Sequence, residues 1–118
     1  MDLNLWWSHV KTALIAIKLD KWVLEVRGRA VEGHDAPDID QDLDGYVDWV
    51  SAYMRVRSVL ESSLGSMLPV IISERRYTAL GEYGTMLDRI KVIRAILEEY
   101  AQVRPIFVNR ARCSWSAG

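Results

Sequence analysis

The sequence is poor in several residue types whose abundance would indicate a specialised architecture. Its 118 residues include a single cysteine, Cys113, together with one phenylalanine and three prolines. A lone cysteine cannot form an internal disulfide, which excludes a disulfide-stapled scaffold and agrees with a reducing compartment. With only seven glycines, collagen-like and low-complexity chains are also excluded.

Long uncharged runs are lacking as well. The longest, residues 62–73, has twelve residues, whereas a membrane-spanning helix needs about 20. The first residues include an acid and lack the basic head and small-residue cleavage site of a secretory signal. We therefore expect a cytoplasmic protein with no membrane association.

No motif for catalysis or cofactor binding is recognisable. The two histidines, His9 and His34, stand far apart and lack the spacing of a metal site. Cys113 falls in a predicted tail, where a reactive thiolate is rarely pre-organised. There is no glycine-rich phosphate loop and no G-x-S-x-G turn. The sequence thus predicts a protein that is not an enzyme and carries no cofactor.

Charge is balanced in total but segregated along the chain. The formal net charge is −1, which argues against a domain built for nucleic acid, since such domains are usually basic overall. Residues 34–51 contain six aspartates and no base, while residues 101–118 contain three arginines, Arg104, Arg110 and Arg112, and no acid. Opposed charged patches suit self-association or recognition of a charged partner.

The first part of the chain predicts one long helix followed by a loop. Apolar residues recur every three or four positions from residue 3 to about residue 29, as in an amphipathic helix. Residues 13–27 have an alternative, a β-hairpin turning at Asp20-Lys21, because a β-prone run follows that pair. Glycines and Pro37 then favour a loop that reaches about residue 43.

Three further helices are predicted beyond the loop. The second helix covers residues 44–63, with Asp44 as its capping acceptor, and the third runs from about residue 66 to residue 80. The fourth begins at a capping box that starts with Thr85 and ends at Pro105.

These elements predict an all-α fold, a four-helix bundle-like domain over residues 1–109. Residues 105–109 are expected to dock on the bundle as a short apolar segment, and residues 110–118 to form a C-terminal tail. We expect Tyr53 of the second helix and Ile93 of the fourth at the centre of the core.

The acidic loop has two interpretations. Asp40, Asp42, Asp44 and Asp48, with Gly45, resemble the start of an EF-hand calcium loop, in which alternate carboxylates surround the ion. The twelfth position, where a bidentate glutamate belongs, is Ser51. We therefore favour an acidic loop that caps a helix, with weak calcium binding as the alternative.

Tryptophan and tyrosine, with five of each, are abundant and are residue types enriched at interfaces. Adjacent Trp6 and Trp7 project about 100° apart on a helix, so that only one can face the core squarely. Trp115 beside the C-terminal arginines offers a stacking site for single-stranded nucleic acid, a third and weaker interpretation.

The preferred function is a non-enzymatic protein-interaction module. A small bacterial or viral accessory protein, an inhibitor or an assembly subunit would fit. We expect a homodimer, because half of the residues of this short chain are apolar. The predicted partner-binding residues are Trp6, Trp7, Asp38, Asp40, Asp42, Arg110, Arg112 and Trp115.

Overall fold

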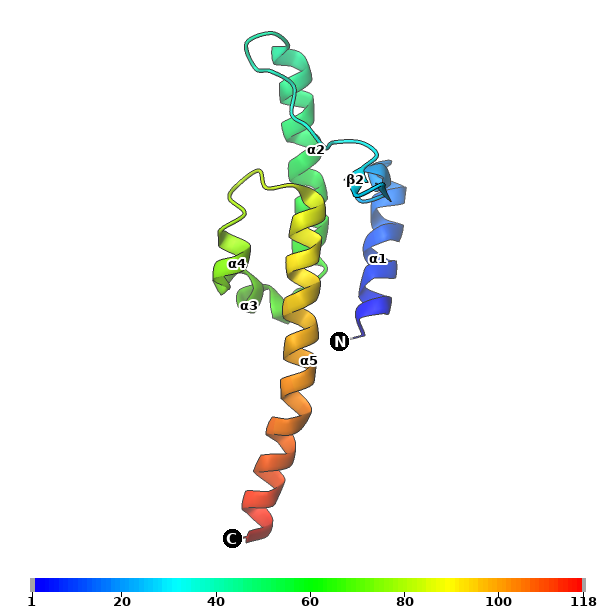
Figure 1. The fold of residues 1–118 in the computed structure, drawn as a ribbon. Coiled ribbons are helices and arrows are strands. Elements are labelled where there is room, and N and C mark those ends of the chain that lie inside the picture. Colours follow the sequence, from blue (N-terminus) through cyan, green and yellow to red (C-terminus); the bar gives the residue numbers. More distant parts are fainter. Residues whose placement is uncertain (1, 118) are drawn as a thin grey trace.

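The computed structural model describes residues 2–117 of the chain, and the side chains of residues 2–101 (Figure 1). Over this range the protein is mostly helical, with five α-helices and one small two-stranded sheet, which confirms the all-α prediction. In chain order the elements are α1 (Leu3–Ala16), η1 (Asp20–Trp22), β1 (Glu25–Val26), β2 (Arg29–Ala30), α2 (Leu43–Ser62), η2 (Gly65–Met67), α3 (Leu68–Ser73), α4 (Arg75–Thr78) and α5 (Met86–Ala117).

Helix α1 is shorter than predicted. It ends at Ala16, and Lys18 adopts a φ of 62°. The backbone N–H groups of Lys18 and Leu19 donate to the carbonyls of Ile15 and Leu14 at 3.0 and 2.9 Å. This is the hydrogen-bond pattern of a Schellman motif, which normally has glycine at the left-handed position. The predicted single helix over residues 3–29 is therefore wrong.

The alternative hairpin over residues 13–27 is also wrong, although a smaller hairpin lies nearby. Strands β1 and β2 pair antiparallel with Val26 opposite Arg29. The two residues between them, Arg27 and Gly28, have φ values of 55° and 78°. Positive φ at both central residues suits the twist of a tight hairpin, so the turn falls here rather than at Asp20-Lys21.

Helix α2 confirms the second predicted helix to within one residue at each end. Its capping residue differs from the prediction. The Asp42 Oδ1 atom accepts a hydrogen bond from the Gly45 N–H at 2.9 Å, whereas Asp44 lies in the first turn. Asp42 thus satisfies one of the backbone donors that a helix start leaves without a partner.

The third predicted helix is divided into short pieces, so the four-helix bundle is not confirmed. A 3₁₀ turn, η2, precedes α3 and α4, which have six and four residues. Glu74 separates these two helices because its ψ of 129° is extended. Three longer helices, α1, α2 and α5, therefore form the body of the fold.

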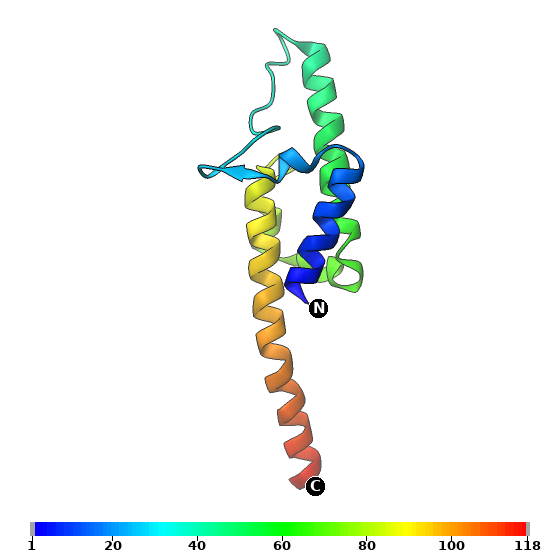
Figure 2. The ribbon, with the colours of Figure 1, turned by 90° about the vertical axis from the view of Figure 1, so that its right-hand side faces the viewer.

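Helix α5 begins as predicted but does not end as predicted. The Thr85 Oγ1 atom accepts from the Asp88 N–H at 3.3 Å, which confirms the cap. The helix then continues through Pro105 to Ala117, 32 residues in all. A proline within a helix removes one hydrogen bond and is disfavoured, yet it does not always end the helix. The backbone of residues 105–117, for which a docked segment and a tail are predicted, belongs to α5, which extends past the other helices (Figures 1 and 2). Their side chains lie outside the described residues, so docking and the tail stay predictions.

The core lies where α1, α2 and α5 pack side by side, with α3 and α4 against them (Figures 1 and 2). Tyr53 and Ile93 are 1% and 0% exposed, which confirms their predicted burial. The other apolar core residues are Trp6, Val10, Leu14, Trp22, Val23, Val56, Leu60, Leu64, Ile71, Tyr77, Met86, Ile90, Ile96 and Leu97.

An aromatic cluster holds the N-terminal connection against α2. It comprises Trp22 of η1, Trp49 and Tyr53 of α2, and Tyr83 of the α4–α5 loop, with neighbouring ring centroids 5.2–6.1 Å apart. Trp49 Nε1 donates to the Gly33 carbonyl at 3.3 Å. A Cβ at Gly33 would lie 2.3 Å from the Trp22 ring. Glycine is therefore required where the backbone of residue 33 packs against this ring.

The molecule is elongated, with principal extents of 69 × 26 × 25 Å. Within the described residues, no helix combines the length and apolar character that crossing a bilayer demands.

Candidate interaction surface

Helix α2 carries two apolar faces. Trp49, Tyr53, Val56 and Leu60, spaced four, three and four residues apart, face the core. Leu43, Val47, Val50 and Met54 repeat the same spacing on a second face, which we name the α2 stripe. At about 100° of rotation per residue, the two faces are about 120° apart. One helix can therefore bury the first face while it exposes the second.

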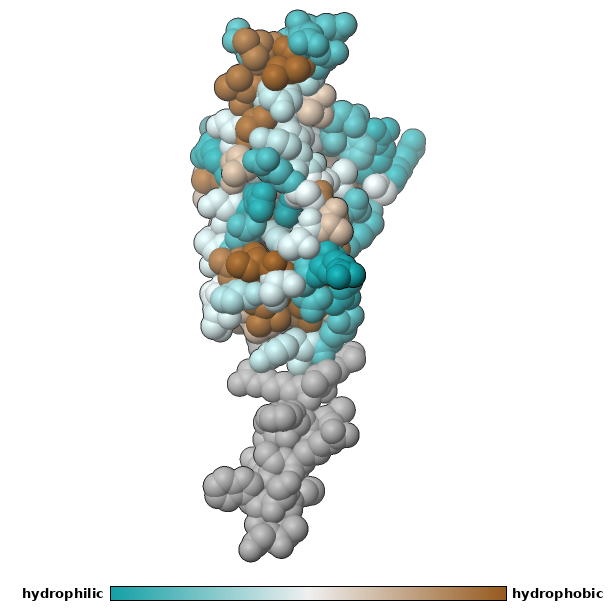
Figure 3. Space-filling model, turned by 90° about the vertical axis from the view of Figure 1, so that its left-hand side faces the viewer, coloured by the Kyte–Doolittle hydropathy of each residue, from teal (hydrophilic) through white to brown (hydrophobic). Residues whose placement is uncertain are grey.

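The α2 stripe is open to solvent. Leu43, Val47 and Met54 are 59%, 56% and 43% exposed, and Val50 is half-buried. The first half of α2 extends beyond the other helices, so that no helix of the same chain covers it (Figures 1 and 2). Apolar surface gathers at this end of the molecule, at the top of Figure 3. Contiguous apolar surface of this kind marks interaction sites.

A groove continues the stripe toward the C-terminal half of α2. It is an open cavity of about 470 Å³ between α2 and the end of α1. Its walls are Ile17, Ser51, Met54, Arg55, Ser58 and Val59. Met54 belongs to both features, so the stripe and the groove form one continuous surface.

Charged residues flank this surface. Asp44 and Asp48 lie on the first half of α2, Arg55 lies on the second half, and all three are exposed. None of them forms an ion pair within the part of the chain whose side chains are described. Their charges are therefore available to a partner.

The aspartates predicted to bind a partner or calcium have different positions in the structure, some in the loop before α2 and some in α2 itself. Asp42 caps α2, and the Asp38 Oδ1 atom accepts from the Asp40 N–H at 2.8 Å. Asp38, Asp40 and Asp42 are exposed. Asp44 and Asp48 belong to the helix, one turn apart, rather than to a loop that curls around an ion. In the described range, no three histidine, cysteine or acidic side chains are grouped to hold a metal ion, so the geometry offers no support for calcium binding.

The predicted aromatic sites of α1 lie inside the fold or at its edge. Trp6 is 4% exposed, and its Nε1 donates to Ser63 Oγ at 2.8 Å. Its assignment to a partner surface is therefore wrong. Trp7 is half-buried, with the Arg94 guanidinium 5.3 Å and the Lys11 ammonium 6.0 Å from its ring. These cations cover part of the ring, and Trp7 helps to join α1 to α5.

The other three predicted partner-binding residues, Arg110, Arg112 and Trp115, belong to α5 by their backbone. Their side chains lie outside the described residues. The same holds for Arg104 and Cys113.

Arg89, for which the sequence predicts no role, is the buried charged residue of the described core at 1% exposure. Its Nη2 donates to Tyr53 Oη and to the Gly81 carbonyl, both at 2.9 Å, and its guanidinium lies 4.9 Å from the Tyr77 ring. The Nε atom is buried without a hydrogen-bond partner. Position 89 lies between apolar positions 86 and 93 on one helical face, a pattern that could have indicated burial.

A polar network joins α2 to α4 beside Arg89. Arg57 Nε donates to Glu61 Oε1 at 2.8 Å, and Tyr77 Oη donates to the same oxygen at 2.7 Å. Burial raises the pKa of Glu61, but the hydrogen bonds from Arg57 and Tyr77 outweigh it and hold the pKa below its ordinary value. Burial, followed by the bond to Glu61, raises the pKa of Tyr77. Arg57, Tyr77 and Arg89 border an open cavity of about 470 Å³, and their mutual contacts indicate a structural role.

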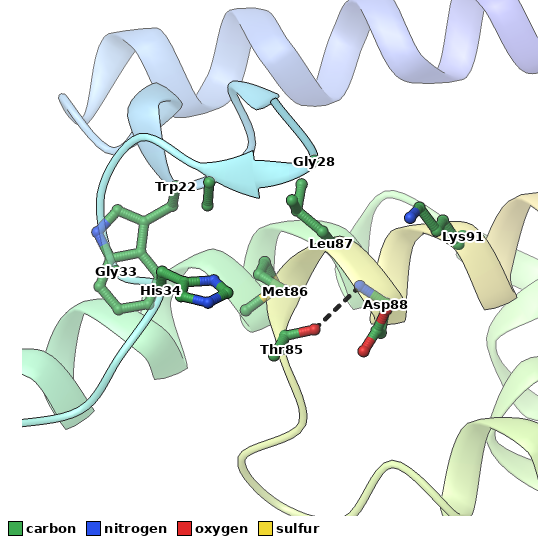
Figure 4. Close-up of a pocket in the computed structure, with 10 residues that line it drawn as sticks. Trp22, Gly28, Gly33, His34, Thr85, Met86, Leu87, Asp88 and Lys91 are labelled. Atoms are coloured by element: carbon green, nitrogen blue, oxygen red, sulfur yellow. Dashed lines mark hydrogen bonds between the residues drawn. The ribbon is translucent and has the colours of Figure 1, made fainter. Parts of the chain in front are cut away.

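A smaller pocket of about 140 Å³ lies between the hairpin and the start of α5 (Figure 4). His34, Thr85, Asp88 and Lys91 supply its polar side chains. Thr85 Oγ1 is engaged with the Asp88 N–H, and His34 Nε2 lies 3.8 Å from Asp35 Oδ1. These interactions stabilise the start of α5 and the hairpin loop.

Comparison of the chain with models of protein families, with curated proteins and with solved structures found no significant match.

Proposed function

We propose that this chain is a non-enzymatic protein-interaction module that binds a protein partner through the α2 stripe. The observation that carries the proposal is the second apolar face of α2, with Leu43 and Val47 more than half exposed. Because these side chains are already partly buried, covering the rest of each would provide roughly 1–2 kcal/mol of stabilisation. A partner that covers the stripe would recover that free energy.

The flanking charges support the same proposal. Exposed charges at the rim of an apolar surface direct association and select among partners. The net charge of −1 leaves little long-range repulsion between this protein and a partner. A single cysteine agrees with action in the reducing cytoplasm. The balanced net charge favours a protein over a nucleic acid as the ligand.

Site-specific photocrosslinking tests this function. A photoreactive amino acid replaces Val47 in one version of the full chain and Val31 in another, and both are expressed in cells of the native host. Val31 is a suitable control because it is 46% exposed and lies after β2, outside the stripe. We expect a protein adduct from position 47 and none from position 31. Absence of any adduct at position 47 would contradict the proposal.

A further inference from the structure

We infer that the partner of the α2 stripe is a second copy of this chain, bound with the two α2 helices antiparallel across a two-fold axis near Val50 and Ser51. This inference rests on the proposed function and adds the identity of the partner. It depends on two independent observations, the distribution of apolar residues and of charges along α2.

The apolar pattern is complementary to itself. In an antiparallel pair centred between Val50 and Ser51, Val47 of one copy lies opposite Met54 of the other, and Leu43 lies opposite Ser58. Leu43 and Val47 protrude, being 59% and 56% exposed. Met54 and Ser58 line the groove. Met54 is itself 43% exposed and Ser58 is exposed. Val47 and Leu43 of each copy would therefore contact the wall of the open groove on the other, and both contacts form twice.

The charges follow the same symmetry. On a helical projection Asp44, Arg55 and Asp48 lie on one flank of the stripe, within about 40° of each other. A two-fold axis perpendicular to the paired helices keeps this flank on the same side in both copies. In the register given above, Arg55 of one copy lies opposite position 46 of the other, midway between Asp44 and Asp48. Each copy thus contributes one arginine and receives one, and opposite charges face each other at both ends.

Antiparallel pairing is also the orientation that the charges require. In a parallel pair, the acidic halves of the two helices, with Asp44 and Asp48, would lie side by side and repel each other. The same would hold for Arg55 and its copy. Apolar residues at alternating spacings of four and three are the pattern that allows two helices to pack along their length.

Sedimentation equilibrium of the full chain over a range of concentrations tests this inference. We expect the unmodified chain to form dimers. Val47→Glu should weaken dimerisation by about tenfold or more, because it places a carboxylate in the apolar contact. Val31→Glu is the matched control and should behave as the unmodified chain. A chain that stays monomeric at high concentration, or equal dimerisation of the two variants, would overturn the inference.

Charge exchange tests the register more sharply. The Arg55→Glu variant and the double variant Asp44→Arg, Asp48→Arg should each dimerise more weakly than the unmodified chain, because like charges then face each other. An equimolar mixture of the two should restore association as a heterodimer, since both charged ends are again complementary. A mixture no stronger than its components would overturn the antiparallel arrangement.

The two proposals can fail separately. If the chain is monomeric in solution but position 47 crosslinks to a different protein in cells, the second copy is the wrong partner and the interaction function stands. If position 47 forms no adduct and the chain is monomeric, both proposals are wrong.

Discussion

A buried guanidinium is costly to remove from water, so Arg89 must be compensated by the groups around it. Its described partners are the Tyr53 hydroxyl, the Gly81 and Glu82 carbonyls and the faces of two tyrosine rings. Tyr53 Oη in turn donates to the Gly84 carbonyl. Residues of α2 and α5 thus hold the α4–α5 loop from both sides.

Tyr53→Phe tests this arrangement at the level of one hydroxyl. The change should destabilise the protein by about 1–3 kcal/mol, because it leaves an Arg89 N–H and the Gly84 carbonyl without their partner. Urea unfolding at neutral pH measures the loss. Tyr100→Phe is the control, since Tyr100 is 44% exposed, and a similar loss in both variants would contradict the role of the Tyr53 hydroxyl.

Glu61 gives the fold an acid-sensitive contact. Its folded-state pKa is held below the ordinary value of 4.5, so its contribution to stability is complete above the unfolded-state pKa. That contribution decreases as the pH falls through the folded-state value. Glu61→Gln should therefore lower stability at pH 7 and flatten its decline below about pH 4.5.

Unfolding in urea between pH 7 and pH 3 measures this effect. Glu98→Gln is a suitable control because Glu98 is exposed on α5 and forms no ion pair among the described side chains. An acid decline as steep in Glu61→Gln as in the unmodified chain would show that other carboxylates determine it.

At the scale of elements, the start of α2 depends on one side chain. Asp42→Ala should cost about 0.5–2 kcal/mol, because the Gly45 N–H loses its acceptor. Asp44→Ala should cost less, about 0.3–1 kcal/mol, since within its own chain Asp44 acts on the helix dipole and does not cap the helix. Thermal unfolding of both variants gives the order, and an equal or reversed order would contradict the cap assignment.

The contact between α2 and α5 supplies the centre of the core. Ile93 of α5 is fully buried, so Ile93→Ala should destabilise the protein by about 2–5 kcal/mol through lost burial and the cavity left behind. Chemical denaturation measures the change. A loss below about 0.5 kcal/mol would show that the core closes around the missing atoms or that this face is not central.

The sequence predicts the elements whose ends carry a recognisable signal. Helix α2 and the start of α5 combine apolar periodicity with a capping residue, and both were predicted within about two residues. The sequence gives no signal for the end of α1, because Lys18 occupies the left-handed position where glycine is usual. Pro105 predicts a helix end because proline is disfavoured within helices, but the backbone of α5 continues through it.

The sequence predicts the α2 stripe only in part, because both faces of α2 carry the same apolar spacing. The spacing of Leu43, Val47, Val50 and Met54 is visible in the sequence, but so is that of Trp49, Tyr53, Val56 and Leu60. Periodicity shows that both faces are apolar, and only the packing of the other helices decides which one is covered. The burial of Trp6 beside a half-buried Trp7 was likewise decided by the position of Ser63 and Arg94.

For the whole molecule, dimerisation would couple folding to concentration. An association that requires the folded α2 stripe stabilises the native state by mass action. The melting temperature of the unmodified chain should therefore rise with protein concentration, while that of Val47→Glu should rise less over the same range. Differential scanning calorimetry over a hundredfold range of concentration checks this, and a melting temperature independent of concentration in both proteins would contradict it.

The aromatic cluster of Trp22, Trp49, Tyr53 and Tyr83 also gives a spectroscopic signal by which the packing of the fold can be followed. Indole and phenol rings held this close in a fixed, asymmetric setting give a circular dichroism signal in the near ultraviolet, which disappears when their packing loosens. The four rings come from η1, α2 and the α4–α5 loop, and Trp6 and Trp7 of α1 form a second close pair. The part of the signal that Trp22→Phe and Trp49→Phe remove reports whether these three segments are joined. If it is lost at lower denaturant than the far-ultraviolet signal of the helices, the segments separate before the helices melt.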